Sequence, residues 1–175
     1  TAYSGTVIFT SSTAIKAFAW NHIAFVRSGS TVTCYINGVS NGTFSSSTNF
    51  STGRLQISGP VDYAPGYLEI VGYASSHRIV KGTAVYTSNF VPPAVPITAV
   101  QNTVLLNNMT SGGIIDYTMM TNSETVGNAS LSTTVTKYGA TSLYFDGTGD
   151  YISLKNPGYN YTFYAGNWTI ESLSM

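Results

Sequence analysis

The sequence predicts an all-β protein, a jelly roll or β-sandwich, on three observations. Short apolar or alternating runs recur along the 175 residues, with Gly, Pro, Asn and Ser between them. This spacing is typical of sandwich and jelly-roll strands. Aromatic residues make up 13% of the chain and charged residues only 8%, which is a composition of strands and turns. No stretch has the apolar period of a helix.

Residues 20–44 predict a β-meander, with strands at about 20–27, 30–36 and 39–44. Ser28-Gly29 and Asn37-Gly38 place a glycine in each turn between these strands, where tight hairpins need a positive φ angle. If the first loop has two residues at Ser28-Gly29, then Phe25 lies opposite Val32, Ile23 opposite Cys34 and His22 opposite Tyr35.

This register makes one face of the meander apolar, so we expect it in the core of the sandwich. The single cysteine, Cys34, lies on that face and is expected to be a buried, inert thiol. The residues expected to be largely buried are Trp20, Ile23, Phe25, Val32, Cys34 and Ile36.

The other expected strands are short runs bounded by turn residues. They are Thr6–Thr10, Arg54–Ser58, Tyr67–Gly72, Val104–Asn107, Ser142–Phe145, Tyr151–Leu154 and Trp168–Glu171. Residues 91–100 hold three of the six prolines. Because proline lacks a ladder donor and favours extended backbone, this segment is the expected domain boundary.

Three segments resemble known families. Residues 20–39 (WNHIAFVRSGSTVTCYINGV) place a tryptophan, a histidine, alternating apolar residues and a Tyr-x-Asn-Gly turn in the order found in the laminin-G / concanavalin-A-like jelly-roll superfamily. Residues 78–93 (RIVKGTAVYTSNFVPP) resemble the closing strand and exit of such domains in bacteriophage structural and tail proteins. Residues 137–152 (KYGATSLYFDGTGDYI) resemble an early hairpin of the same fold.

In this chain the late segments of that family precede the early ones. The chain is therefore either circularly permuted or cut across a tandem pair of domains. Too few residues precede Trp20 or follow Glu171 to supply the strands that the family has between them, which favours the tandem cut. The expected division is the C-terminal part of one jelly roll at 1–93, a Pro-rich linker at 94–103 and the N-terminal part of a following jelly roll at 104–175.

Several function classes are not predicted. A formal net charge of zero gives no electrostatic basis for binding nucleic acid, and no apolar run reaches the roughly 18 residues of a membrane span. Enzymes of the resembled superfamily that cleave glycosides place paired acids on one strand. None of the seven acids forms a Glu-x-Asp-x-x-Glu arrangement, so no catalytic residues are assigned and no enzyme activity is expected. His22 is expected to be structural, packed against Tyr35.

A calcium ion at the sandwich rim is common in laminin-G-like domains, so the resemblance suggests calcium as the one candidate cofactor. Asp146 and Asp150 bracket Gly147-Thr148-Gly149, and a hairpin there would bring both carboxylates to one loop. The alternative, which we favour, is that both aspartates accept hydrogen bonds from the backbone of their own turn.

Glycan binding needs flat aromatic faces and short polar side chains. Two tyrosine-rich loops, at 62–67 and 156–164, combine these groups. The candidate ligand-binding residues are Asp62, Tyr63, Tyr67, Tyr159, Asn160 and Tyr161. The alternative is that these tyrosines serve structure or a subunit interface.

The resemblance implies a structural and adhesion module of a phage-type virion or tail-fibre protein, with host-surface glycan as a candidate ligand. The alternative is a secreted or cell-surface, non-catalytic lectin-like module. The expected location is the virion or the extracellular space, and the expected partners are copies of itself or other virion proteins. The low charge predicts a homo-oligomer, a trimer if the tail-fibre resemblance holds.

Overall fold

The computed structural model describes residues 2–3, 7–48, 56–58, 70–109, 114–118, 122–155, 163 and 165–175. These residues form strands, turns and bends and contain no helix. Every strand pairing among them is antiparallel. The all-β prediction is confirmed. The described residues also include no helix of the length and apolar character that a membrane crossing requires.

The strands are numbered in chain order. They are β1 (Ala2–Tyr3), β2 (Val7–Phe9), β3 (Asn21–Ser28), β4 (Thr31–Ile36), β5 (Val39–Ser45), β6 (Gln56–Ile57), β7 (Val71–Lys81), β8 (Thr103–Asn107), β9 (Asn122–Val126), β10 (Ser130–Ser132), β11 (Ser142–Asp146), β12 (Tyr151–Lys155) and β13 (Trp168–Ser174).

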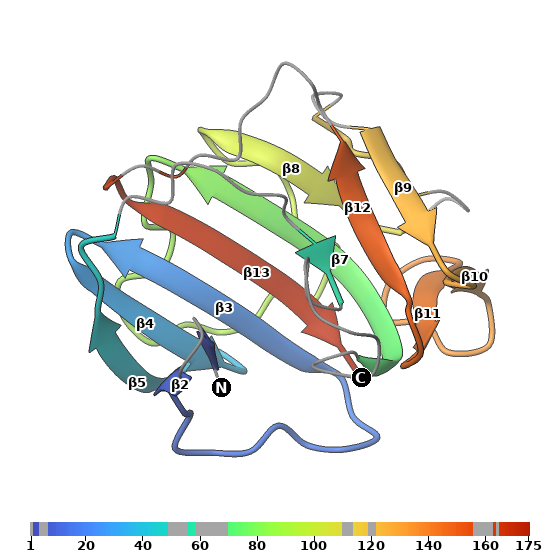
Figure 1. Ribbon diagram of the computed structural model, residues 1–175, viewed down its shortest axis with the longest axis horizontal. Helices are drawn as coiled ribbons and strands as arrows, with labels where there is room; N and C mark the ends of the chain where they lie inside the picture. Colours follow the sequence, from blue (N-terminus) through green and yellow to red (C-terminus); the bar gives the residue numbers. More distant parts are fainter. Residues whose placement is uncertain are drawn as a thin grey trace.

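Two sheets pack against each other as a β-sandwich. The larger has eight strands in the order β10-β11-β7-β13-β3-β4-β5, and β8 also pairs with β7 (Figure 1). The smaller has the order β6-β12-β9. One apolar cluster joins them, because Ile152 and Leu154 of β12 pack with Ile79, Leu105 and Phe145 of the large sheet.

The large sheet contains strands from both halves of the chain, with β13 inserted between two strands of the first half. β13, near the end of the chain, lies between β3 and β7 (Figure 1) and pairs with both along its length. Residues 94–103, expected to be a linker, contribute Ile97 to a buried cluster with Leu106 and Leu173. The two halves therefore share one sheet and one core here, while their assignment to successive domains stays a prediction.

The meander forms as predicted, but its first hairpin has a different register. Phe25 lies opposite Cys34 and Ile23 opposite Ile36, where the predicted partners were Val32 and Cys34. The loop is Gly29-Ser30 rather than Ser28-Gly29, because Gly29 takes the first loop position with φ +61°. The error is two residues, so each side chain still lies on the predicted face.

Burial follows the predicted face only in part. Val32, Cys34 and Ile36 are buried, whereas Trp20, Ile23 and Phe25 are half-buried. Burial raises the pKa of the Cys34 thiol, in keeping with an inert cysteine.

The long strand β7 was predicted only in pieces. Its centre reads Ala74-Ser75-Ser76-His77, which lacks the apolar alternation of a strand, yet all four residues are buried. Ser76 has φ +31° and falls where the β7–β13 register shifts, between the pairs Ser172–His77 and Leu173–Ser75. The strand was not predicted as one element, because its short polar side chains lack apolar alternation and the bulge interrupts the two-residue period.

The Asn37-Gly38 turn leads to a prediction about stability. Gly38 has φ +78°, and a Cβ added there would lie 1.9 Å from the carbonyl oxygen of Phe90. Gly29 has a similar φ, but an added Cβ would meet nothing within 4 Å. Gly29→Ala is therefore expected to cost only the strain of left-handed backbone, about 1–2 kcal/mol. Gly38→Ala should cost clearly more in urea unfolding, and equal losses would contradict the close approach of Phe90.

Candidate functional site

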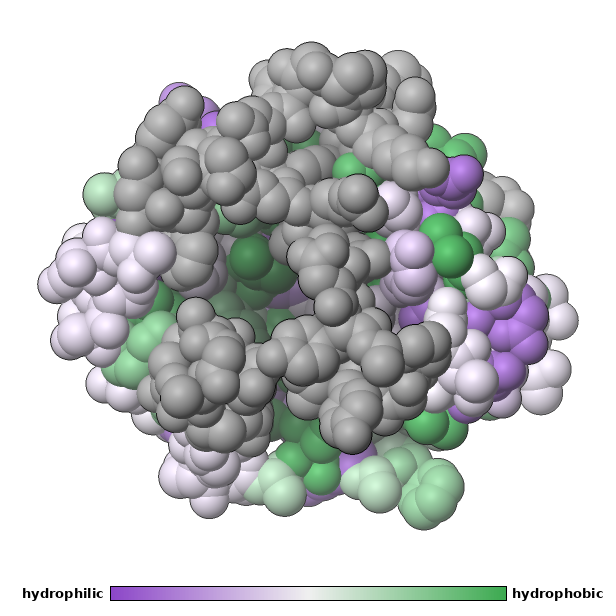
Figure 2. Space-filling model, in the orientation of Figure 1, coloured by the Kyte–Doolittle hydropathy of each residue, from purple (hydrophilic) through white to green (hydrophobic). Residues whose placement is uncertain are grey.

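An exposed groove lies where the loop between β2 and β3 meets the starts of β7 and β11. Its volume is about 740 Å³. We call it the aromatic groove and define it by Ile15, Lys16, Phe18, Tyr73 and Tyr144. The C-terminal Met175 also borders it, and in Figure 1 the β2–β3 loop runs beside the C-terminus. Figure 2, in the same orientation, shows hydrophobic residues along the lower edge of the molecule, where this loop runs.

Neighbouring strands fix the two tyrosines of the groove. Tyr73 on β7 and Tyr144 on β11 are directly opposite each other, and their ring centroids lie 5.2 Å apart. The backbone groups of Met175 bond to those of Tyr73 at 2.8 Å. Gly72 makes this approach feasible, because a Cβ there would lie 2.0 Å from the Met175 carbonyl oxygen.

Phe18 is held in an unusual conformation at the edge of this groove. Its side chain is 94% exposed and its φ is +58°, a strained combination for a bulky residue. The buried Asn21 holds the loop in place, since its amide donates to the carbonyls of Lys16 and Ala19 at 2.9 and 2.7 Å. Its Oδ1 accepts from the Lys16 N–H at 3.1 Å. These hydrogen bonds hold the loop in which the Phe18 ring is exposed to solvent.

The aromatic groove has the groups that a sugar requires. Tyr73, Tyr144 and Phe18 offer aromatic faces for C–H surfaces, while the tyrosine hydroxyls and the Lys16 ammonium can bond hydroxyl or acidic groups. Sequence reasoning missed this groove because its members come from three separate segments. The predicted ligand residues Asp62, Tyr63, Tyr67, Tyr159, Asn160 and Tyr161 lie outside the described residues.

The predicted metal pair, Asp146 and Asp150, lies in one loop as expected. The two Asp150 oxygens accept the backbone N–H groups of Asn128 and Asp146 at 2.8 and 3.0 Å. Those of Asp146 accept from the Thr148 N–H at 2.7 Å and the Asn128 side-chain amide at 3.0 Å. The hydrogen bond from the Asn128 side chain, followed by that from Thr148, lowers the pKa of Asp146.

Each of the four carboxylate oxygens therefore already accepts a hydrogen bond. The donors Asp146 N–H and Thr148 N–H lie in the same turn, as the capping interpretation expects, whereas the other two belong to Asn128 in a different turn. Calcium needs about six to eight oxygen ligands. Within the described ranges, no group of three or more His, Cys, Asp or Glu side chains is arranged to hold a metal ion. Binding of calcium by this loop stays a prediction, and a rise in melting temperature with added calcium, reversed by a chelator, would establish it.

The capping interpretation predicts unequal effects for the two aspartates. Asp150 is fully buried, and Asp150→Ala leaves two backbone N–H groups without their acceptor. We expect a loss of about 1–3 kcal/mol in the free energy of unfolding. Asp146→Ala, in the more exposed position, should cost less. Urea unfolding of both variants tests this, and the reverse order would contradict it.

A second polar cluster is buried beneath residues 84–98 on the outer face of the large sheet, centred on Glu171 of β13. Glu171 Oε1 accepts from Arg78 Nε at 2.5 Å, and Oε2 accepts from the Tyr86 hydroxyl at 2.8 Å. His22 Nε2 lies 2.9 Å from Oε2. Arg78 also donates to the Thr98 carbonyl at 2.6 Å.

This cluster is closed to solvent, which indicates a structural function. The Glu171 side chain is 0% exposed, and burial together with the Glu171 charge raises the pKa of Tyr86. The prediction that His22 is structural agrees with this burial, but its ring packs on Phe90 and Tyr86, at 5.5 and 6.2 Å between centroids, rather than on the expected Tyr35. Tyr35 lies opposite Ala24.

Comparison with known proteins gives one match. Residues 1–69 match the family model described as the Concanavalin A-like lectin/glucanases superfamily, and this range contains the meander that carries the resemblance. No curated protein and no solved structure matches the chain. Together with the all-β architecture, the match supports a jelly-roll domain, which fits a carbohydrate-binding or a structural module.

Proposed function

We propose that this chain is a structural and adhesion module of a phage-type virion or tail-fibre protein, and that its aromatic groove binds a host-surface glycan. The observation that supports glycan binding is the aromatic groove itself. Three aromatic rings border one hollow of about 740 Å³, and one of them, Phe18, is held in strained backbone. The virion half rests on the resemblance of residues 78–93 and 137–152 to phage proteins.

The proposed module binds without catalysis. Glycoside hydrolysis uses two carboxyl groups that face the substrate. Among the described acids, Glu171 and Asp150 are buried and accept hydrogen bonds. Asp116 accepts the backbone N–H groups of Leu106 and Thr118, each at 3.0 Å. These three carboxylates serve the fold, which supports a non-catalytic function.

An array of bacterial surface polysaccharides, probed with the full chain, tests the glycan half. Tyr144→Ala and Phe18→Ala should each weaken binding of the best glycan about two- to tenfold, since one aromatic stacking contact is worth about 0.5–1.5 kcal/mol. Tyr117→Ala is the matched control, because Tyr117 is exposed but lies outside the groove. No binding by the wild type, or equal affinity of all variants, would refute the groove as the glycan site.

Self-association tests the structural half. Low charge and a net charge of zero leave little repulsion between copies. At one end of the large sheet the backbone of β5 already bonds to Ser12 and Asn89, whereas β10 forms the other end, where backbone groups can pair with another chain. Sedimentation at micromolar concentration should give a homo-oligomer, and a trimer would agree with a fibre. A monomer that persists at high salt would instead favour the alternative, a secreted or cell-surface lectin-like module.

A further inference from the structure

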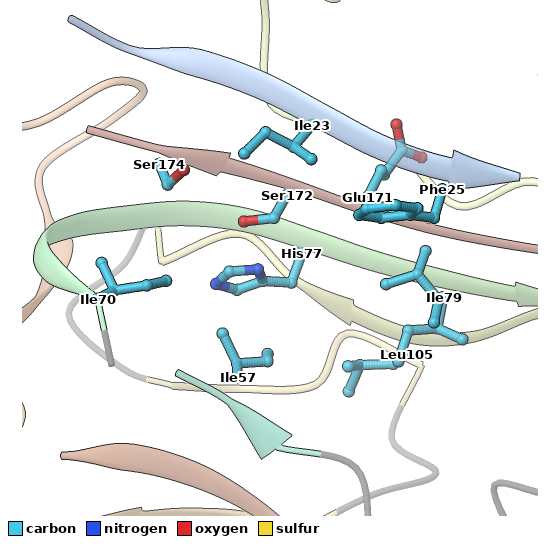
Figure 3. A pocket seen from close by; sticks show the side chains of 11 residues that line it. Ile23, Phe25, Ile57, Ile70, His77, Ile79, Leu105, Glu171, Ser172 and Ser174 are labelled. Carbon is cyan, nitrogen blue, oxygen red and sulfur yellow. The ribbon is translucent and has the colours of Figure 1, made fainter. Parts of the chain in front are cut away.

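A half-open cavity of about 220 Å³ lies between the two sheets, and Glu171 is among the residues that line it. Figure 3 shows isoleucines and Phe25 around it, with Ile57 of β6 on one side and the large sheet on the other. We call it the inter-sheet cavity. Its polar lining residues, His77, Glu171, Ser172 and Ser174, come from the neighbouring strands β7 and β13.

His77 is the unusual member of this lining. Its side chain points among the apolar groups (Figure 3), the residue is 3% exposed, and Nε2 is buried without a hydrogen-bond partner in the structure. An unsatisfied buried polar atom costs about 1–3 kcal/mol. A leucine at this position would avoid the destabilisation that the unsatisfied nitrogen causes. A ligand that forms a hydrogen bond with Nε2 would also remove this destabilisation.

The carboxylate of Glu171 does not satisfy His77. Because Ser172 pairs with His77 and Glu171 pairs with Arg78, and successive strand residues point to opposite faces, the ion pair lies on the other side of the sheet. The inter-sheet cavity is thus mostly apolar, and its hydrogen-bonding side chains are those of His77, Ser172 and Ser174 on the large sheet.

We propose that the inter-sheet cavity binds a small phenol-like molecule, a single aromatic ring carrying one hydroxyl that hydrogen-bonds His77 Nε2. The size fits, because an apolar protein cavity of about 150 Å³ is sufficient to bind benzene. The polarity fits as well, since a hydroxyl can donate to or accept from an imidazole nitrogen, whichever tautomer His77 adopts.

Calorimetry of the full chain with phenol tests this inference, and toluene is the matched probe without a hydroxyl. Phenol is expected to bind about tenfold more tightly than toluene, the equivalent of one hydrogen bond. His77→Phe should abolish this preference. Ile57→Phe, on the two-residue strand β6, fills the cavity from its edge and should weaken both probes.

Tyr144→Ala is the control for location and should leave phenol binding unchanged, because Tyr144 lines the aromatic groove and not the cavity. The same variant should weaken glycan binding, so the two proposals can fail separately. Circular dichroism of each variant verifies that it is folded. Absence of phenol binding by the wild type, or equal binding by wild type and both cavity variants, would overturn the inference.

Discussion

Glu171→Leu is expected to lower the free energy of unfolding by about 3–5 kcal/mol, the usual cost of removing one partner of a buried ion pair. Glu171 is the shared partner of Arg78, Tyr86 and His22, so the substitution leaves a buried guanidinium without its anion. Arg78→Met should cost a similar amount, because it leaves the carboxylate buried without its cation. Urea unfolding followed by tryptophan fluorescence measures both.

The double variant separates the ion pair from general packing effects. If the loss comes from an unpaired buried charge, Glu171→Leu combined with Arg78→Met should be much less destabilised than the sum of the single variants. Glu124→Gln, on an exposed residue of β9, serves as the control and should change stability by about 0.5 kcal/mol or less. Additive losses in the double variant would show that the two side chains act independently.

The strands were predictable wherever apolar residues alternate between turn residues. The meander at 21–45 and the strands β8, β11, β12 and β13 follow this pattern and appear where expected. β9 and β10 were missed, because Asn122–Val126 and Ser130–Ser132 are short and mostly polar. These segments form strands because they pair with β12 and β11. Such pairing is a tertiary contact, which the local sequence does not predict.

The buried polar groups were the least predictable feature of the site. Glu171 was expected only as the end of a strand, and Arg78 only as part of a family-like segment. Their contact spans 93 residues of sequence and exists because β13 lies beside β7. The aromatic groove has the same origin, since Tyr73 and Tyr144 meet only through the pairing of β7 with β11.

His77 makes stability depend on pH in a defined direction. Burial lowers the pKa of His77 from 6.5 to about 4, because the charged imidazolium is disfavoured away from water. Between these two values the unfolded chain binds a proton that the folded chain does not. The contribution of neutral His77 to the free energy of unfolding is therefore fully present above pH 6.5, and it is lost as the pH falls from 6.5 towards 4.

The loss should approach about 1.4 kcal/mol per pH unit in that window, or about 3 kcal/mol in all. Unfolding of wild type and His77→Phe at a series of pH values isolates this contribution, because both proteins carry the same acids and His22. The difference between their unfolding free energies should change steadily from pH 6.5 to 4 in favour of the variant, and level off above pH 7. Parallel curves would mean that His77 is protonated as readily in the folded protein as in the unfolded chain, and therefore that water reaches the inter-sheet cavity.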